Sequence, residues 1–502
     1  MPHVPHPTRA LFLSPLILLC STCQIIGGLE DLQLALVSGS GGAGGGGGTS
    51  SVSTSSSSGS GGGGSDTPIS ATWSRAFGDT STQSVTDVAV DKQGNIFLAG
   101  FFVGTLAFDP AAPLISAGDY DAFLAKLDTD GNHLWSIRFG GTGPDRIESL
   151  SLTSTGDPVV GGSYGAAFSI GMTNFTFGGG TDALVARFSG TDGTLAWGRH
   201  FGDAQDSRCA AVSVAVGNDS VTCLGDFSGV VDVGGSSLTS AGVLDLVVVQ
   251  YSSTGTVSTA SRSGDSLSQI AKSIAATPGG ILFGAARFNG VIDWGPVTSA
   301  GGGDVFLGRL IEKAPASWAL RMGDSNTQQP NGMSVVGANG GVALVGDFEG
   351  FADFGGKALS SKGLFDAFVT RVDAAGKVLW IRTIGDADPM TSTEDQYATD
   401  VAAMDDGTLF VTGYAAGTIN FGDGVVSGPS DTDFYVLRMD ATGQTTWHSR
   451  VAASGSQFGR AIALSGTDEF VVVGDFRDTM DLGNGPLTSA GNNDVFVAKF
   501  KR

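Results

Sequence analysis

The chain has 502 residues, with 27 Lys and Arg against 49 Asp and Glu, giving a formal net charge of −22. Because non-specific binding to nucleic acid or to an anionic membrane needs clustered basic residues, this charge argues against both partners. The 41% of hydrophobic residues argues against a disordered chain, whereas 79 glycines and only 15% charged residues indicate β-structure with many turns.

The first 23 residues have the pattern of a targeting segment. Arg9 precedes an apolar run over residues 10–19, which is too short for a membrane-spanning helix of about 20 residues. Small residues and a cysteine follow, which resembles a bacterial lipoprotein signal with a lipidated cysteine. We expect lipidation at Cys23, with Cys20 as the alternative site and an ordinary cleaved signal as the alternative reading. Gln24 after Cys23 implies, through the same resemblance, the outer membrane.

Residues 24–66 are expected to form a short mature N-terminus followed by a flexible tether. From residue 39 onward this segment consists almost entirely of Gly, Ser and Thr, which have no large side chains to bury. The tether would reach about 30 Å on a root-mean-square basis. The sequence thus predicts an exported protein, lipid-anchored at the outer membrane or cell surface, or otherwise periplasmic or secreted.

A repeated unit of about 60 residues fills the rest of the chain. A heptapeptide of the type DAFLAKL occurs seven times, with spacings between 59 and 67 residues. Most copies are followed by a turn and a strand that opens with Trp, and a further Trp strand precedes the first copy at Trp73. The heptapeptides start at Asp121, Asp182, Asp245, Asp304, Asp366, Asp433 and Asp494.

Each unit is expected to contain four principal strands. In the first unit the apolar pattern predicts strands over residues 88–90, 96–101, 123–127 and 135–139, with an excursion after the second strand that can hold a small hairpin. Seven such sheets avoid long unpaired edges when they are arranged radially. We therefore expect residues 67–502 to form an all-β, single seven-bladed β-propeller of four-stranded blades.

The phase of the repeat predicts how the ring closes. The repeat region begins with a Trp strand at residues 73–77 and finishes with the heptapeptide strand at residues 494–500. The last blade therefore lacks an outer strand of its own, and the N-terminal strand is expected to supply it.

The repeated motifs resemble the SBBP-type β-propeller repeat of bacterial exported proteins. The pattern combines WxxxxGD, VAVDxxGNIFLAG and LTSAGxxDxFVAKLD and covers about residues 72–502, while the second copy and the fourth, which has Thr259 instead of Trp, depart from it. The resemblance implies a propeller fold and an extracytoplasmic setting. RVDAAGKVLW at residues 371–380 also resembles the tryptophan-docking repeat of quinoprotein dehydrogenases, which implies packing between blades and no quinone.

The seven heptapeptide Asp residues are interpreted as structural. A carboxylate at the start of a buried strand can accept backbone N–H groups of the neighbouring turn, and the same residue type in every blade favours packing over chemistry. A second set after Gly is expected to shape the loops between blades: Asp79, Asp203, Asp265, Asp324 and Asp386.

Two other patterns are candidate sites. Asp128, Asp130 and Asn132 place oxygen atoms at alternate positions as a weak Ca²⁺ candidate, and an Asp/Gly turn without metal is the simpler reading. The GxSxG match at residues 161–165 is read as a repeat element, because no His cluster accompanies it. No catalytic residue and no cofactor is assigned.

Cys209 and Cys223 are the cysteines of the repeat region. An exported domain permits a disulfide, but a hairpin turn centred on Asn218 does not place the two residues directly opposite each other. The sequence therefore leaves two alternatives for these cysteines, a disulfide or two buried thiols.

The function favoured by the sequence is a non-enzymatic binding or interaction module, expected to be monomeric, with a protein or polysaccharide ligand of the cell envelope. Recurrent loops of the type LTSAG, at residues 114–118, 238–242, 297–301 and 487–491, are read as turns or as a polyvalent glycan surface. The alternatives are an envelope-assembly scaffold lipoprotein and a propeller glycan hydrolase or lyase. Residues that break the repeat would mark an enzyme site: Glu148, Arg208, Arg287, Glu349 and Tyr414.

Overall fold

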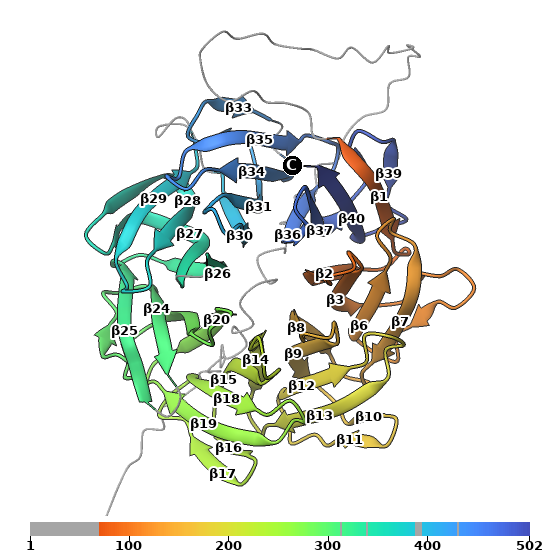
Figure 1. Cartoon of the computed structure of the whole chain (residues 1–502), viewed down its shortest axis with the longest axis vertical. Helices are drawn as coiled ribbons and strands as arrows, with labels where there is room; N and C mark the ends of the chain where they lie inside the picture. Colours follow the sequence, from red (N-terminus) through yellow and green to blue (C-terminus); the bar gives the residue numbers. More distant parts are fainter. Residues whose placement is uncertain (1–69, 312–313, 338–339, 387–393, 429–430, 502) are drawn as a thin grey trace, which may run out of the picture. The chain divides into compact units, whose positions relative to one another are not determined.

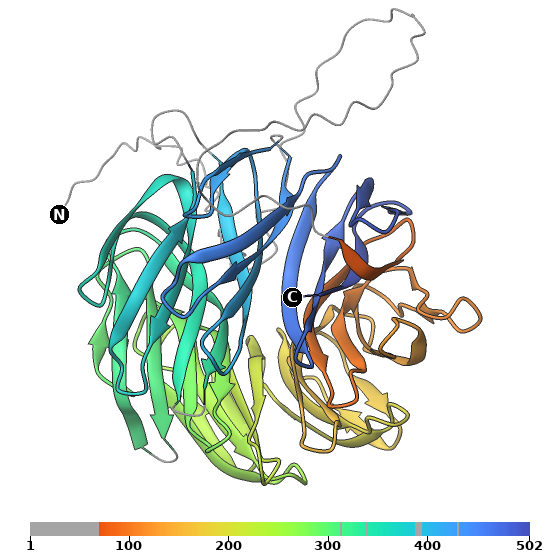
Figure 2. The same ribbon diagram turned by 45° about the horizontal axis from the view of Figure 1, so that its top comes forward.

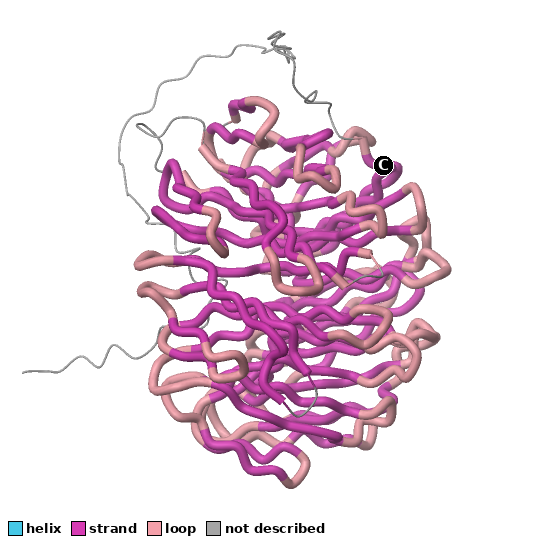
Figure 3. The backbone as a smooth tube through the Cα atoms, turned by 60° about the vertical axis from the view of Figure 1, so that its left-hand side comes forward, coloured by secondary structure: helices cyan, strands magenta, loops and turns pink. Residues whose placement is uncertain are grey.

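The computed structural model describes residues 70–311, 314–337, 340–386, 394–428 and 431–501, which belong to the unit Gly62–Arg502. These residues form strands and loops without any helix (Figure 3). Within them, no helix offers the length and hydrophobicity needed to cross a membrane. The predicted signal with Cys20 and Cys23, and the predicted tether up to residue 66, lie outside the described residues.

The described strands are organised in seven antiparallel four-stranded groups, numbered here in chain order (Figure 1). Each group has an inner strand, a second, a third and an outer strand, so the fold is all-β, as predicted. Groups 1 to 4 are β2-β3-β6-β7, β8-β9-β12-β13, β14-β15-β18-β19 and β20-β21-β24-β25, and groups 5 to 7 are β26-β27-β28-β29, β30-β31-β34-β35 and β36-β37-β40-β1.

The bounds of these strands follow the repeat. The inner strands are β2 (Gln83–Val90), β8 (Asp145–Leu152), β14 (Ser207–Val214), β20 (Gln269–Ala276), β26 (Gln328–Val336), β30 (Gln396–Ala403) and β36 (Gln457–Ser465). The second strands are β3 (Ile96–Phe102), β9 (Pro158–Tyr164), β15 (Val221–Phe227), β21 (Leu282–Phe288), β27 (Gly341–Phe354), β31 (Leu409–Ala415) and β37 (Glu469–Phe476).

The remaining two positions of each group are equally regular. The third strands, which carry the heptapeptides, are β6 (Asp121–Leu127), β12 (Asp182–Phe188), β18 (Asp245–Tyr251), β24 (Asp304–Ile311), β28 (Ala358–Val372), β34 (Asp433–Met439) and β40 (Asp494–Lys501). The outer strands are β7 (His133–Phe139), β13 (Leu195–Phe201), β19 (Val257–Ser263), β25 (Ala314–Gly323), β29 (Val378–Ile384), β35 (Thr445–Val451) and β1 (Ala71–Phe77).

The excursions between the second and third strands hold the small hairpins that the sequence allowed for. These are β4 (Thr105–Leu106) with β5 (Leu114–Ile115), β10 (Phe168–Ile170) with β11 (Thr173–Phe175), β16 (Val230–Val233) with β17 (Ser236–Thr239), β22 (Val291–Ile292) with β23 (Val297–Thr298), β32 (Thr418–Asn420) with β33 (Val425–Ser427), and β38 (Thr479–Asp481) with β39 (Pro486–Thr488). In group 5 the hairpin is continuous with β27 and β28.

Groups 4 and 5 differ from the prediction of separate four-stranded sheets, because they form one eight-stranded sheet within the described chain. They are joined by β25 and β27, where Met322 pairs with Phe354 and Gly323 with Asp353. Since β27 continues through the excursion without a break, its far end reaches the edge of β25. The fusion is therefore limited to the ends of these two strands.

The inner strand of group 1 is longer than predicted. The sequence pattern indicated residues 88–90, whereas β2 begins at Gln83. Thr86 is a β-bulge, seen as a register shift between Val85 and Asp87 in the pairing with β3. An extra residue reverses the alternation of side chains, and this reversal hid the first half of the strand.

Strand β1 pairs with β40 in antiparallel register, from Ala71 opposite Phe500 to Phe77 opposite Val495. Figure 2 shows the first described strand, in orange, beside the dark-blue C-terminal strand. The inner strands also follow one another in space, each beside that of the next group, and β36 lies beside β2.

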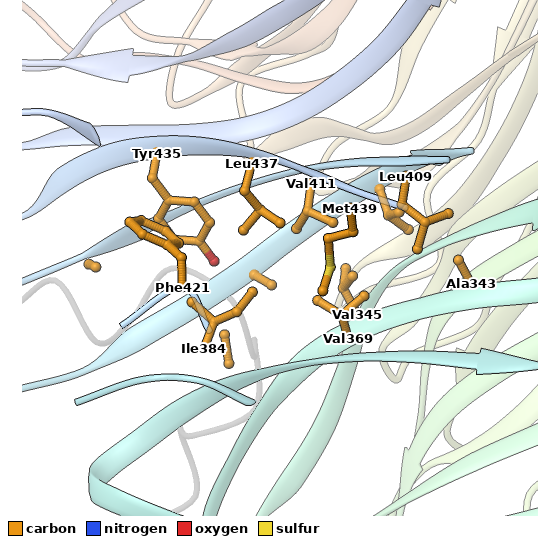
Figure 4. Packing of buried hydrophobic residues seen from close by; sticks show 14 of the residues in the cluster. Ala343, Val345, Val369, Ile384, Leu409, Val411, Phe421, Tyr435, Leu437 and Met439 are labelled. Carbon is orange, nitrogen blue, oxygen red and sulfur yellow. The ribbon is translucent and has the colours of Figure 1, made fainter. Parts of the chain in front are cut away.

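The hydrophobic core lies between the faces of neighbouring groups. Figure 4 shows one such layer, where Val345 and Val369 of group 5 pack with Val411, Leu437 and Met439 of group 6. All five side chains are almost fully buried. The dense apolar runs of the second and third strands are explained by this packing, because these strands are covered on both faces.

Each heptapeptide Asp is nearly inaccessible to solvent, and six of the seven are the first residue of their third strand, whereas Asp366 lies within the longer β28. In six groups its Oδ2 accepts the backbone N–H of the residue four positions earlier, as Asp182 does from Gly178 at 2.8 Å and Asp494 from Ala490 at 2.8 Å. Glycine follows the outer strand in most groups because a Cβ there would overlap the carboxylate; at Gly202 it would lie 2.0 Å from Asp182 Oδ1.

Five of the repeated Trp residues join their group to the next. Trp135 Nε1 donates to Gly190 O at 3.3 Å, and Trp197 Nε1 donates to Ser253 O at 3.0 Å. Trp73, in group 7, makes the same bond to Thr129 O of group 1 at 3.0 Å. Five indoles lie against a glycine of the following turn; these glycines are Gly131, Gly193, Gly255, Gly376 and Gly443.

Candidate functional site

A cavity of about 310 Å³ is lined by residues of all seven inner strands of the described structure. We call it the axial cavity. The inner strands reach it through their β-bulges, since every inner strand has one register shift at the same point of its pairing. The bulged residues, here called the cavity ring, are Thr86, Glu148, Ala210, Lys272, Asn331, Thr399 and Arg460.

The cavity ring is the most variable of the repeated positions described so far. Positions that pack between groups carry the same residue type in nearly every copy, whereas the cavity ring contains an acid, two bases, an amide, two hydroxyls and a methyl group. Bulges are common where a strand must redirect a side chain towards a site. The same backbone feature thus presents a different chemical group in each sheet.

A second layer of residues precedes the bulges by two positions. In each group one inner-strand residue there pairs with a residue of the second strand, and we call these seven combinations the mouth pairs. They are Ser84 with Phe101, Arg146 with Ser163, Arg208 with Asp226, Ile270 with Arg287, Gln329 with Asp347, Tyr397 with Tyr414 and Phe458 with Asp475.

Asp347 occupies the centre of a polar segment of this layer. Its Oδ1 accepts hydrogen bonds from Asn331 Nδ2 at 2.8 Å and from Gln329 Nε2 at 3.2 Å. The residue is fully buried, and no hydrogen-bond partner is found for Oδ2 among the described residues. Burial raises the pKa of Asp347 to about 6. The hydrogen bonds from Asn331 and Gln329 act in the opposite direction, as do the charges of Lys272 and Arg287.

An aromatic segment adjoins Asp347 in groups 6 and 7. The rings of Tyr397 and Tyr414 have centroids 4.9 Å apart, and Tyr414 meets Phe458 edge-on at 5.0 Å. The guanidinium of Arg460 lies 4.9 Å from the ring centroid of Phe458 and 5.9 Å from that of Tyr414. Arg460 is held in this position by Nε, which donates to Asp475 Oδ2 at 2.8 Å.

Cationic residues occupy the other side of the mouth. Arg208 donates to both oxygens of Asp226 at 3.0 to 3.1 Å. Arg146 instead lies over the rings of Phe101, at 4.7 Å, and Tyr120, at 5.0 Å. The buried Nε atoms of Arg146 and Arg287 have no hydrogen-bond partner among the described residues.

Burial shifts the pKa values of several groups beside the axial cavity. It raises the pKa of Asp87 to about 7, although the amides of Leu150 and Val88 lower it. Burial, followed by the charge of Asp87, raises the pKa of Asp400 to about 8. Burial also lowers the pKa of Lys272 to about 8, and the charges of Arg208 and Arg287 act in the same direction. These groups can therefore change charge near neutral pH.

The Asp128 loop, proposed as a weak Ca²⁺ site, forms a hydrogen-bonded turn between β6 and β7. Asp128 Oδ1 accepts the backbone N–H groups of Asp130 at 2.9 Å and Asn132 at 2.8 Å, and its Oδ2 accepts Asn132 Nδ2 at 2.9 Å. In the part of the chain that the structure describes, no three His, Cys, Asp or Glu side chains are grouped as a metal site. The turn is thus held together by hydrogen bonds within the chain.

Cys209 and Cys223 form a disulfide between β14 and β15, with Cα atoms 5.8 Å apart. They are not directly opposite, because Cys209 pairs with Gly225 and Cys223 with Val212. The bulge at Ala210 separates the two pairings. Both sulfur-bearing residues are fully buried between groups 2 and 3.

The residues that break the repeat come together in part. Glu148 belongs to the cavity ring, and Arg208, Arg287 and Tyr414 belong to the mouth pairs. Glu349 follows Phe348 on β27 and belongs to neither layer. Ser163 of the GxSxG match is a mouth residue on β9, not part of a strand-to-helix turn. The sequence missed the grouping because the bulges shift each inner strand out of the period-2 pattern.

Comparison with known proteins gives one sequence relative and several distant folds. No family model matches the chain. The Regulatory protein FlaEY of Caulobacter vibrioides is 28% identical over 385 residues, which cover 70% of this chain and 38% of that protein. The match thus spans well under half the length of this relative.

Solved structures with a similar arrangement are remote in sequence. A protein of unknown function from Dyadobacter fermentans is 10% identical, with a TM-score of 0.41 and coverage of 87% of this chain and 100% of that chain. YCF48 bound to D1 peptide is 10% identical, with a TM-score of 0.39 and coverage of 86% and 97%. The quinohemoprotein alcohol dehydrogenase from Comamonas testosteroni is 11% identical, with a TM-score of 0.40 and coverage of 86% and 76%. At these scores the likenesses give no functional information.

Proposed function

We propose that this chain is an exported, lipid-anchored seven-bladed β-propeller that acts as a non-enzymatic binding module. The seven four-stranded groups would be its blades, and the pairing of β1 with β40 would close the ring. Two observations support closure: Trp73 of group 7 bonds to Thr129 of group 1, and β36 lies beside β2. The SBBP resemblance and the lipoprotein-like segment with Cys23 support export.

The observation that carries the binding role is the contrast between packing and axial positions. The Asp and Trp positions that hold the groups together repeat around the molecule, whereas the cavity ring and the mouth pairs change from group to group. A scaffold needs only the repeated positions. Chemically different side chains at equivalent places are what selective contacts with a ligand require. The word regulatory in the name of the Caulobacter relative fits a binding role.

Binding is tested with the full-length mature protein, immobilised and exposed to envelope proteins and to an array of glycans. A mouth variant, Tyr414→Leu, is expected to lose the ligand that the native protein retains. Arg438→Gln, an exposed change on β34 outside both layers, is the control and is expected to keep it. Chemical conversion of a retained glycan, seen as new reducing ends or unsaturated products, would contradict the non-enzymatic part of the proposal.

Lipid anchoring is tested separately by expression in a bacterium with a labelled fatty acid. Cys23→Ser is expected to abolish labelling and membrane retention, while Cys20→Ser leaves both unchanged. Labelling that depends on Cys20, or none at all, would contradict the assignment to Cys23.

A further inference from the structure

We infer that the mouth of the axial cavity binds an acidic polysaccharide, with one uronate residue held across groups 4 to 7. This inference rests on the proposed binding function and adds the class of ligand. The contiguous segment that would form the site runs through four successive groups. Its residues are Lys272, Arg287, Gln329, Asp347, Tyr414 and Arg460.

The first indication of a ligand is a set of buried polar atoms without partners. Asp347 Oδ2, Arg287 Nε and Arg460 Nη2 are inaccessible and make no hydrogen bond within the described chain. A buried polar atom without a hydrogen-bond partner lowers the free energy of unfolding of the protein. Donors and an acceptor are both present, so the complementary molecule must both accept and donate hydrogen bonds. Sugar hydroxyl groups do both.

The second indication is the aromatic surface beside these atoms. Tyr414 is only partly buried, and its ring lies between those of Tyr397 and Phe458. Aromatic rings offer an apolar face that packs against the C–H face of a sugar ring without requiring hydrogen bonds. Because its neighbours contact the Tyr414 ring on two sides, the ring is held in one orientation before any ligand arrives. Less conformational entropy is then lost on binding.

The excess of cations specifies the charge of the sugar. Asp475 pairs with Arg460 and Asp226 pairs with Arg208, whereas Arg287 makes no ion pair among the described residues. Burial lowers the pKa of Lys272, and the charges of Arg208 and Arg287 act in the same direction, whereas those of Asp347 and Asp226 oppose them. A carboxylate placed between Arg287 and Lys272 would add to the charge of Asp347 in offsetting the repulsion between the two cations, and it would accept charge-assisted hydrogen bonds.

An extended glycan fits the position of the site better than a folded protein surface. Asn331 and Gln329 hold the carboxylate of Asp347, and Asp475 holds Arg460. These planar groups are fixed in the way that bidentate contacts to neighbouring hydroxyls require. They lie next to a cavity of about 310 Å³, which can hold part of a small ligand but not a protein domain.

The test measures binding of a short oligogalacturonide to the full-length mature protein by calorimetry, beside a neutral gluco-oligosaccharide of the same length. The acidic probe is expected to bind more tightly and to weaken as salt is added. Arg287→Gln and Tyr414→Leu are each expected to weaken its binding by about tenfold or more. Tyr414→Phe, which keeps the ring, is expected to stay near the native affinity.

Arg438→Gln is the matched charge control, and unfolding curves show whether each variant keeps its fold. Equal binding of the neutral probe would overturn the acidic specificity and leave the proposed binding module intact. A ligand of protein nature that depends on Tyr414 would likewise overturn the inference alone. Acidic binding that survives both Arg287→Gln and Tyr414→Leu in folded protein would overturn the site itself.

Discussion

Asp475 on β37 accepts a hydrogen bond from the backbone N–H of Val85 on β2 at 3.1 Å, although 390 residues separate them in the chain. The same carboxylate accepts Ser84 Oγ at 2.9 Å and Arg460 Nε at 2.8 Å. One buried acid therefore connects group 7 to group 1 and also orients a residue of the cavity ring. The junction between the ends of the chain and the candidate site depend on the same side chain.

Replacing Asp475 by Ala is expected to lower the free energy of unfolding by about 3–5 kcal/mol, because the change leaves the guanidinium of Arg460 buried without its partner. Chemical denaturation of the full-length protein measures the loss. Asp130→Ala, at an exposed turn position, is the control and is expected to stay within about 0.5 kcal/mol of the native value. Equal stability of the two variants would show that this junction contributes nothing.

Trp73→Ala is expected to destabilise the protein by about 3–5 kcal/mol, as for other buried large side chains. The indole is 8% exposed and donates to Thr129 O across the junction of groups 7 and 1. Thermal unfolding monitored by circular dichroism reports the change. Leu134→Ala, on the outer strand β7 and 49% exposed, serves as the comparison, and a native-like melting curve for Trp73→Ala would count against closure at β1.

The strands and the pairing partner of β1 could be predicted from the sequence, because the Asp heptapeptide and the Trp strand recur at a steady spacing. The pairing of β1 with β40 follows from the phase of those motifs alone. What the sequence did not reveal is the first half of the inner strand β2. Bulges such as the one at Thr86 break the alternation there, and their positions depend on pairing with the second strand.

The stability that two buried carboxyl groups contribute is expected to fall as the pH rises from about 4 to about 8. Asp87 and Asp400 have folded pKa values of about 7 and about 8, above the ordinary value of 3.8. The folded state thus binds their protons more tightly, and the associated stability is present at low pH and lost as each carboxyl ionises. For Asp87 the full shift corresponds to about 4 kcal/mol, an upper bound because the side chain is partly exposed.

Asp87→Asn is the variant that checks this assignment. Denaturation at a series of pH values should give a flatter decline than in the native protein, since one of the two ionisations is removed. The pKa of Asp400, followed by NMR, should also move down because the charge of Asp87 contributes to its shift. A decline identical to that of the native protein would assign the pH dependence to other groups.

Double replacement of Cys209 and Cys223 by Ala is expected to cost about 3 kcal/mol, the entropy of closing a loop of this size. The two residues are 14 positions apart and fully buried. Mass spectrometry after alkylation under denaturing conditions checks the bridge: neither cysteine should react before reduction, and both should react afterwards. Labelling of both residues without reductant would contradict the disulfide.

The candidate site shows why single motifs were poor guides. Arg208, Arg287 and Tyr414 stood out in the sequence because each breaks the repeat, but they lie 79 and 127 positions apart. Only the inward placement of equivalent strand positions brings them into one layer. Asp347 was overlooked because GDF also occurs at Asp226 and Asp475, and its special feature, an unpartnered Oδ2, is a property of its surroundings.

Hydrogen exchange of the full-length mature protein, measured with and without a saturating acidic oligosaccharide, tests the central claim of a ligand site at the mouth most directly. We predict added protection at the starts of β26, β30 and β36 and in β21 and β27, with none in the outer strands. Protection confined to the excursion hairpins or to the outer strands would contradict the claim, because the ligand would then bind away from the axial cavity.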